Sequence, residues 1–124
     1  MATIKSYTDI SQSKALAEIL PLESADMHYS KDFDGRWVID LAKYISVKIP
    51  KYVGNVEEHL LPCWSLAALL GTFNEIKMCH YNNRYYCQYM SEGSEFPIYS
   101  TVEYNNPIDA CYEMILKLNV LNLL

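Results

Sequence analysis

The sequence predicts an α+β fold in which helices and a mainly antiparallel sheet follow the order α-βββ-α-βββ-α. Three observations predict it. The most apolar ten residues, 62–71, begin with proline and end with glycine, which suit the start and the stop of a helix. Several short segments alternate apolar and polar residues, as half-buried strands do. Asn82-Asn83 lies between two such segments and is typical of a two-residue hairpin turn.

The first helix is predicted over residues 10–20. Thr8 or Asp9 can cap its N-terminus, because a short oxygen-bearing side chain accepts hydrogen bonds from the first free backbone N–H groups. Pro21 follows the segment and ends it, since proline has no N–H to continue the helix.

A hairpin is predicted next, because residues 27–30 and 36–40 both alternate. A five-residue loop, residues 31–35, would set Tyr29 opposite Trp37 and Met27 opposite Ile39. All four large side chains would then share one face of the sheet, where cross-strand pairs stabilise each other.

A third strand is predicted over residues 44–49, where three β-branched residues alternate, and Pro50 ends it or confines it to a sheet edge. Residues 51–61 are the most loop-like stretch of the chain. The central helix over residues 62–71 follows. Its almost wholly apolar composition predicts that it is buried on most sides.

The clearest hairpin runs from Ile76 to Tyr89 around Asn82-Asn83. A two-residue turn pairs Tyr81 with Arg84, and the same register continues down both strands. One face then holds Ile76, Met78, His80, Tyr85, Cys87 and Tyr89, and the other holds Lys77, Cys79, Tyr81, Arg84, Tyr86 and Gln88.

A last strand is predicted over residues 98–104, and a last helix follows it. Asn106 suits the N-cap of this helix, Pro107 its first position and Asp109 its third. The buried stripe of the helix is expected to contain Ile108, Cys111, Ile115 and Leu118.

At 124 residues the chain is predicted to form a single domain, residues 1–124, with a sizeable core. Residues 16–21 resemble residues 66–71, and three candidate strands follow each segment. One interpretation is therefore two pseudo-halves, residues 8–52 and 62–104, closed by a helix over 106–121. Chance similarity is the other interpretation, because short matches without a strict period are weak evidence of duplication.

The charge balance is acidic, with ten Lys and Arg against fifteen Asp and Glu and a formal net charge of −5. This balance repels phosphate backbones and disfavours nucleic acid as a partner. No segment has the pattern of a signal peptide or the length of a membrane span. We therefore expect a cytoplasmic protein that does not enter a membrane.

A cytoplasmic setting predicts that the four cysteines are free thiols. Cys63 is a nucleophile candidate, because its predicted place at a helix N-terminus would lower its pKa, and His59 precedes it by four residues. A buried structural thiol is the favoured interpretation, since spacing does not establish a hydrogen-bonded pair. Residues 30–35 resemble the front of a calcium loop but lack its closing glutamate. No catalytic residue, metal site or cofactor is predicted.

The best binding candidate is the surface formed by Tyr81, Arg84 and Tyr86, because aromatic residues and arginine dominate protein interfaces. The alternative is that a helix covers this face and only the tyrosine hydroxyls reach its edge. The sequence leaves these two interpretations open.

Three segments carry a family resemblance: residues 6–27, residues 62–70, and residues 106–124 with their Asn106-Pro107-Ile108-Asp109-Ala110-Cys111 start. Together they resemble a family of short uncharacterised proteins from gut anaerobes, often associated with phages or mobile elements. The resemblance covers about half the chain. It implies a bacterial, cytoplasmic setting and carries over no activity, substrate or site.

The sequence thus favours a non-enzymatic, protein-binding accessory or regulatory domain. The partner is an unidentified protein, and a second copy of the chain in a homodimer is one possibility. A nucleic-acid-associated regulator and a thiol-dependent enzyme are the alternatives.

Overall fold

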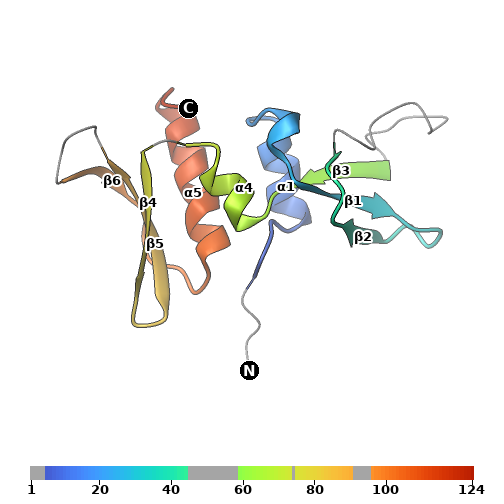
Figure 1. Cartoon of the computed structure of the whole chain (residues 1–124), viewed down its shortest axis with the longest axis horizontal. Coiled ribbons are helices and arrows are strands. Elements are labelled where there is room, and N and C mark those ends of the chain that lie inside the picture. The colour runs from blue at the N-terminus through green and yellow to red at the C-terminus, as the bar shows by residue number, and fades with distance from the viewer. Residues whose placement is uncertain (1–4, 45–58, 74, 91–95) are drawn as a thin grey trace. The chain divides into compact units, whose positions relative to one another are not determined.

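The structure is a computed structural model that describes residues 5–44, 59–73, 75–90 and 96–124. Its element order confirms the predicted α-βββ-α-βββ-α arrangement, with a short 3₁₀ helix added after the first helix (Figure 1). Both sheets are antiparallel and have three strands, so the α+β class is also confirmed. The chain forms two compact units. The N-terminal unit is Tyr7–Ala68, and the C-terminal unit combines Met1–Ser6 with Leu69–Leu124.

The N-terminal unit begins with helix α1, Ile10–Ala17. Asp9 is its N-cap, and its carboxylate accepts a hydrogen bond from the Gln12 N–H at 2.8 Å. The Gln12 side chain bonds back to the Asp9 N–H and completes a capping box. The helix ends three residues earlier than predicted, and the 3₁₀ helix Leu22–Ser24 follows Pro21.

Strands β1 (Met27–Lys31), β2 (Trp37–Asp40) and β3 (Leu60–Cys63) form the first sheet in the order β2-β1-β3. Tyr29 lies opposite Ile39 rather than opposite Trp37, so the predicted register was wrong by two residues. The reason is the loop, where the Asp32 carboxylate accepts hydrogen bonds from the Asp34 and Arg36 N–H groups, both at 2.9 Å. The loop still has five residues, 32–36, but it lies one position further along the chain than predicted, and the Asp32 carboxylate bonds the backbone within it.

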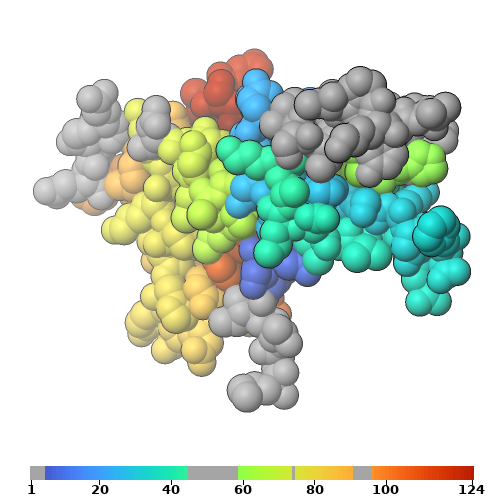
Figure 2. All heavy atoms as spheres, turned by 45° about the vertical axis from the view of Figure 1, so that its right-hand side comes forward, coloured from blue at the N-terminus to red at the C-terminus, as the bar shows by residue number. Residues whose placement is uncertain are grey.

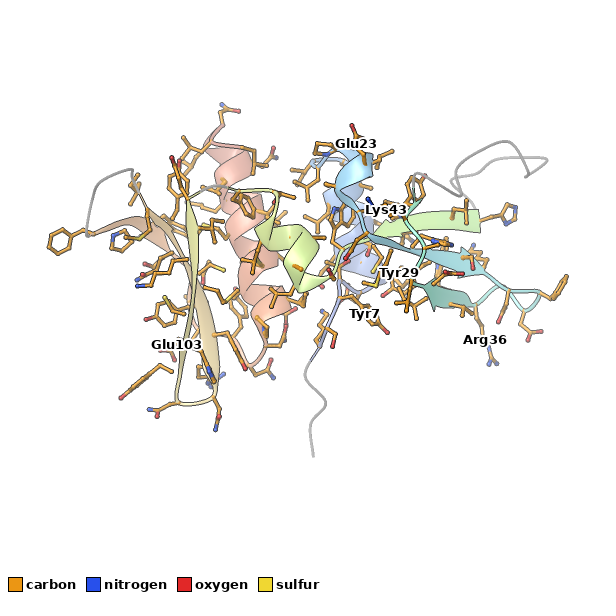
Figure 3. All side chains as sticks on the ribbon, viewed as in Figure 1. Tyr7, Glu23, Tyr29, Arg36, Lys43 and Glu103 are labelled. Atoms are coloured by element: carbon orange, nitrogen blue, oxygen red, sulfur yellow. The ribbon has the colours of Figure 1, made fainter. Side chains whose placement is uncertain are left out.

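The large apolar side chains of β1 and β2 still lie on one face of the sheet, because a shift of two residues preserves the side-chain alternation. Its centre is a buried apolar cluster of Met27, Tyr29, Leu61 and Cys63. The half-buried side chains that pack against this cluster are Tyr7, Ile10, Trp37 and Ile39. The rings of Tyr7 and Tyr29 meet edge to face with their centroids 6.3 Å apart (Figure 3).

The segment predicted as one central helix contains a strand and a shorter helix. Pro62 and Cys63 belong to β3, and helix α4 covers only Leu66–Leu70. Pro62 is tolerated there because, among the described residues, β3 pairs with β1 on one side only, and the other side of the strand needs no N–H donor. Trp64 and Leu69 are fully buried, which confirms the expected burial of the segment at these two positions.

The C-terminal unit contains strands β4 (Ile76–Tyr81), β5 (Arg84–Met90) and β6 (Pro97–Ser100) in that spatial order. Helix α5, Pro107–Val120, follows them. Its start confirms the prediction, because the Asn106 side chain accepts a hydrogen bond from the Asp109 N–H at 2.9 Å with proline at the first position. The predicted buried stripe is also confirmed, since Ile108, Cys111, Ile115 and Leu118 are all fully buried.

The strand predicted over residues 44–49 lies outside the described residues from position 45 onward. The two sheets also differ in topology, because the central strand is the first in one sheet and the second in the other. The sequence similarity between residues 16–21 and 66–71 therefore has no equivalent in strand order.

Candidate functional site

The β4–β5 hairpin has the predicted register and turn. Tyr81 pairs with Arg84, His80 with Tyr85 and Met78 with Cys87. Asn82 and Asn83 have φ angles of 50° and 58°, the left-handed values that a two-residue turn of this kind requires. Alternation along the paired strands then divides the side chains between two faces of the sheet.

Helix α5 packs against the face that contains Cys87, which we call the inner face. Cys87 is fully buried and its thiol interacts with the thiol of Cys111 on α5. This interaction and burial raise the pKa of Cys87 far above its ordinary value. Near the other end of the helix, the Lys117 ammonium lies 5.2 Å from the centroid of the Tyr99 ring.

 The inner face is therefore part of the core of the C-terminal unit.

The opposite, outer face is defined by six side chains: Lys77, Cys79, Tyr81, Arg84, Tyr86 and Gln88. At the tip of the hairpin Tyr81 is 68% exposed and Arg84 is also exposed, whereas Tyr86 is half-buried. Figure 2 shows the yellow side chains of β4 and β5 at the surface of this view. The sequence left open whether a helix covers this face. Within the C-terminal unit, α5 packs on the inner face instead.

Tyr86 is held in place by its neighbours on the outer face. A hydrogen bond with Cys79, its cross-strand partner, is the main cause that raises the pKa of Tyr86. The Glu103 carboxylate raises that pKa further by repelling a phenolate (Figure 3). The Tyr86 hydroxyl therefore stays protonated at neutral pH, and its bond to Cys79 fixes the position of the ring on the outer face.

The charge of the outer face differs from that of the whole chain. Lys77 and Arg84 place two positive charges on it, and Glu103 near Tyr86 contributes one negative charge. The chain as a whole has a net charge of −5. The outer face is thus a slightly basic, tyrosine-rich surface on an acidic protein, and this combination suits a partner that presents carboxylates.

Cys63 does not occupy the position that the sequence predicted. It lies in β3 rather than at a helix N-terminus, and its side chain is fully buried. Its thiol donates to the Thr8 carbonyl oxygen at 3.5 Å. Burial raises the pKa of the Cys63 thiol, which is the opposite of the helix effect expected from the sequence. His59 is exposed, so the two side chains differ in their access to solvent.

The buried polar groups around Cys63 form a structural network. The Tyr29 hydroxyl donates to the Thr8 carbonyl oxygen at 2.7 Å, and the Thr8 hydroxyl lies 2.8 Å from that of Ser13. The Trp64 N–H donates to the Thr8 hydroxyl at 3.2 Å. These hydrogen bonds link the segment before α1 to the end of β3. They account for the burial of Thr8 by a structural role.

Two other histidines, His28 and His80, have structural partners. His28 is buried, and its Nδ1 lies 2.7 Å from the Ala42 carbonyl oxygen. The His80 ring stacks on that of Tyr85 with their centroids 4.3 Å apart. Among residues 5–44, 59–73, 75–90 and 96–124, no three His, Cys, Asp or Glu side chains gather as a metal site would require. No helix within the same ranges has both the length and the apolar character needed to cross a bilayer.

Sequence reasoning missed a pocket of about 390 Å³ in the N-terminal unit. Lys14 and Glu18 line it together with Trp37 and Tyr44, and its floor includes residues of β3. The only signal in the sequence was the spacing of Lys14 and Glu18 on one helix face. The apolar side of the pocket could not be predicted, because the sequence pattern favours a loop and a helix where β3 lies.

No protein-family model, curated protein or solved structure matches this chain. The resemblance to short proteins of gut anaerobes therefore stays a prediction from the sequence.

Proposed function

We propose that this chain is a non-enzymatic protein-binding domain and that the outer face of the β4–β5–β6 sheet binds an acidic segment of its partner. The observation that supports the proposal best is the position of α5. Because α5 packs on the inner face, the Tyr81 and Arg84 side chains at the hairpin tip are left exposed. Exposed tyrosine and arginine side chains on a rigid hairpin are typical of interface hot spots.

The chemistry of the outer face supports a partner with carboxylates. Arg84 can bind a carboxylate with two parallel hydrogen bonds, and Lys77 adds a second positive charge on the neighbouring strand. The tyrosine rings of Tyr81 and Tyr86 supply apolar contact area at a low cost in conformational entropy. An acidic segment that also contains apolar side chains would satisfy both parts of this surface.

The buried thiols support a non-enzymatic role. Cys63, Cys87 and Cys111 are fully buried, and burial contributes to the raised pKa of Cys63 and of Cys87. A thiol of this kind is a poor nucleophile at neutral pH, because the thiolate is the reactive form.

The experiment is a calorimetric titration of the full chain with synthetic peptides. The first peptide contains glutamate and leucine, the second replaces each glutamate with lysine, and the third replaces each with glutamine. We expect the glutamate peptide to bind, and to bind at least about tenfold more tightly than the other two. Equal binding of all three peptides, or binding of none, would contradict the proposal.

Substitutions locate the binding surface. The double variant Tyr81→Ala with Tyr86→Ala, and the single variant Arg84→Ala, are each expected to weaken binding of the glutamate peptide by about tenfold or more. Phe33→Ala is the matched control, since Phe33 is a fully exposed aromatic residue in the hairpin loop of the other unit. If all the variants bind like the wild type, the surface assignment is wrong.

A nucleic-acid-associated regulator is the second candidate, because bases can also stack on tyrosine and arginine. The same titration with ten-nucleotide oligo(dT) and oligo(U) distinguishes the two. Binding of an oligonucleotide that weakens steeply with salt and requires Tyr81 would favour this candidate over a protein partner. The net charge of −5 opposes it.

The biological setting is part of the proposal. We infer an accessory or regulatory role in the bacterial cytoplasm, on a phage or other mobile element, from the sequence resemblance alone. A second copy of the chain is one partner that the proposal admits. Sedimentation of the wild type and of the Tyr81→Ala, Tyr86→Ala variant tests whether the outer face mediates dimerisation.

A further inference from the structure

A pocket of about 390 Å³ lies within the N-terminal unit, apart from the outer face. Its volume falls in the range of small-molecule sites in proteins. One side is apolar and comes from β3, with Leu60 and Leu61 among its residues. Trp37 and Tyr44 add aromatic side chains to the lining.

The polar part of the pocket comes from α1. Lys14 in its last turn and Glu18 at its C-cap both line the pocket, and their spacing of four residues places them on one face of the helix. Neither forms an ion pair with another residue in the parts of the chain that the structure describes. The pocket therefore offers one unpaired positive and one unpaired negative charge beside an apolar surface.

The two opposite charges, on Lys14 and Glu18, determine which charges a ligand of the pocket should have. A ligand with a single negative charge would be attracted by Lys14 and repelled by Glu18, and a single positive charge would meet the reverse. A zwitterion can satisfy both charges at once. The C-terminal end of α1 favours a cation near Glu18, because the helix dipole is negative there.

We propose that this pocket binds a free amino acid with a large apolar side chain. Its carboxylate pairs with Lys14, its ammonium pairs with Glu18, and its side chain contacts Leu60, Leu61 and Trp37. The proposal does not depend on protein binding by the outer face, since the two surfaces belong to different units.

The experiment is a titration of the ¹⁵N-labelled full chain with L-phenylalanine, phenethylamine and 3-phenylpropanoate. The two analogues keep the ring but have only the ammonium or only the carboxylate. The readout is the indole N–H signal of Trp37, and that of Trp64 is an internal reference, because its Nε1 donates to the Ser24 hydroxyl at 2.9 Å and its side chain is fully buried. We expect L-phenylalanine to shift the Trp37 signal in a saturable way and to bind about tenfold more tightly than either analogue.

Two variants test the roles of the charges. Lys14→Gln and Glu18→Gln are each expected to weaken binding of L-phenylalanine by about fivefold or more. In Lys14→Gln, phenethylamine is expected to bind as well as L-phenylalanine, because the partner of the carboxylate is gone. Glu23→Gln and Arg36→Gln are matched controls, since both residues are exposed in the same unit and neither lines the pocket (Figure 3).

Three results would overturn the proposal. The first is the absence of a saturable shift with L-phenylalanine and with L-leucine up to about 10 mM. The second is equal affinity for L-phenylalanine and both analogues, which would show that the charges of the pocket do not select the ligand. The third is an affinity that Lys14→Gln and Glu18→Gln leave unchanged.

Discussion

The Tyr29 hydroxyl is the most informative single group in the buried network of the N-terminal unit. It donates to the Thr8 carbonyl oxygen at 2.7 Å, and the Tyr29 side chain is 7% exposed. Tyr29→Phe removes this hydrogen bond and keeps the ring in the apolar cluster. The Thr8 carbonyl oxygen retains the Cys63 thiol as a donor, so it is not left without a partner.

The expected loss follows from these contacts. A buried hydrogen bond contributes about 1 to 1.5 kcal/mol net, so the free energy of unfolding should fall by about that amount. For a chain of 124 residues the entropy of unfolding is about 0.26 kcal/mol/K, and the midpoint of thermal unfolding should drop by about 4 to 6 °C. Tyr7→Phe is the control, because Tyr7 packs against the same cluster and no described residue bonds its hydroxyl. It should change the midpoint by less than about 2 °C.

The pH dependence gives this prediction a second test. Burial is the main cause that raises the pKa of Tyr29, so the folded state keeps the hydroxyl protonated after the unfolded chain has begun to ionise. The stability that the protonated hydroxyl contributes is complete below about pH 10 and is lost as the pH rises above that value. The difference between the wild type and Tyr29→Phe should therefore be constant up to about pH 9 and shrink as the pH rises above about 10. Thermal unfolding followed by circular dichroism measures both effects, and a midpoint that Tyr29→Phe leaves unchanged would refute the reasoning.

The remaining predictions concern the thiols, a helix cap and a turn. Alkylation of the folded protein, followed by mass spectrometry, should modify half-buried Cys79 before buried Cys63. Faster reaction of Cys63 would favour the thiol-dependent enzyme over the binding domain. Asn106→Ala should lower the free energy of unfolding by about 1 kcal/mol in a urea titration, because it removes the cap of α5; no loss would show that the cap is dispensable. Asn83→Val should destabilise the protein by about 1 to 2 kcal/mol, whereas Asn83→Gly should be tolerated, because the φ of 58° excludes β-branched residues. Equal stability of these two turn variants would argue against the left-handed turn.

Much of the C-terminal unit could be predicted, because its signals are local. Asn82-Asn83 determines the turn and therefore the register, and Asn106-Pro107 determines where α5 begins. The composition of the outer face follows directly from that register. Its exposure could not be predicted, because the residues that α5 covers depend on contacts between segments distant in the sequence.

The N-terminal unit shows why other predictions failed. The hairpin register depends on which loop N–H groups the Asp32 carboxylate binds, and sequence spacing does not determine that choice. Pro62 suits both a helix start and an edge strand, and only pairing with β1 decides between them. The incorrect helix start in turn placed Cys63 in the wrong environment and gave its pKa shift the wrong direction.

Protection of Tyr81 from nitration tests most directly whether the outer face is a binding surface. The full chain is treated with tetranitromethane alone and with a saturating amount of the glutamate peptide, and nitrated tyrosines are located by mass spectrometry. We predict that Tyr81 is nitrated before buried Tyr29 in the free chain and that the peptide protects Tyr81. Slow nitration of Tyr81 in the free chain, or nitration that the bound peptide does not slow, would contradict the account.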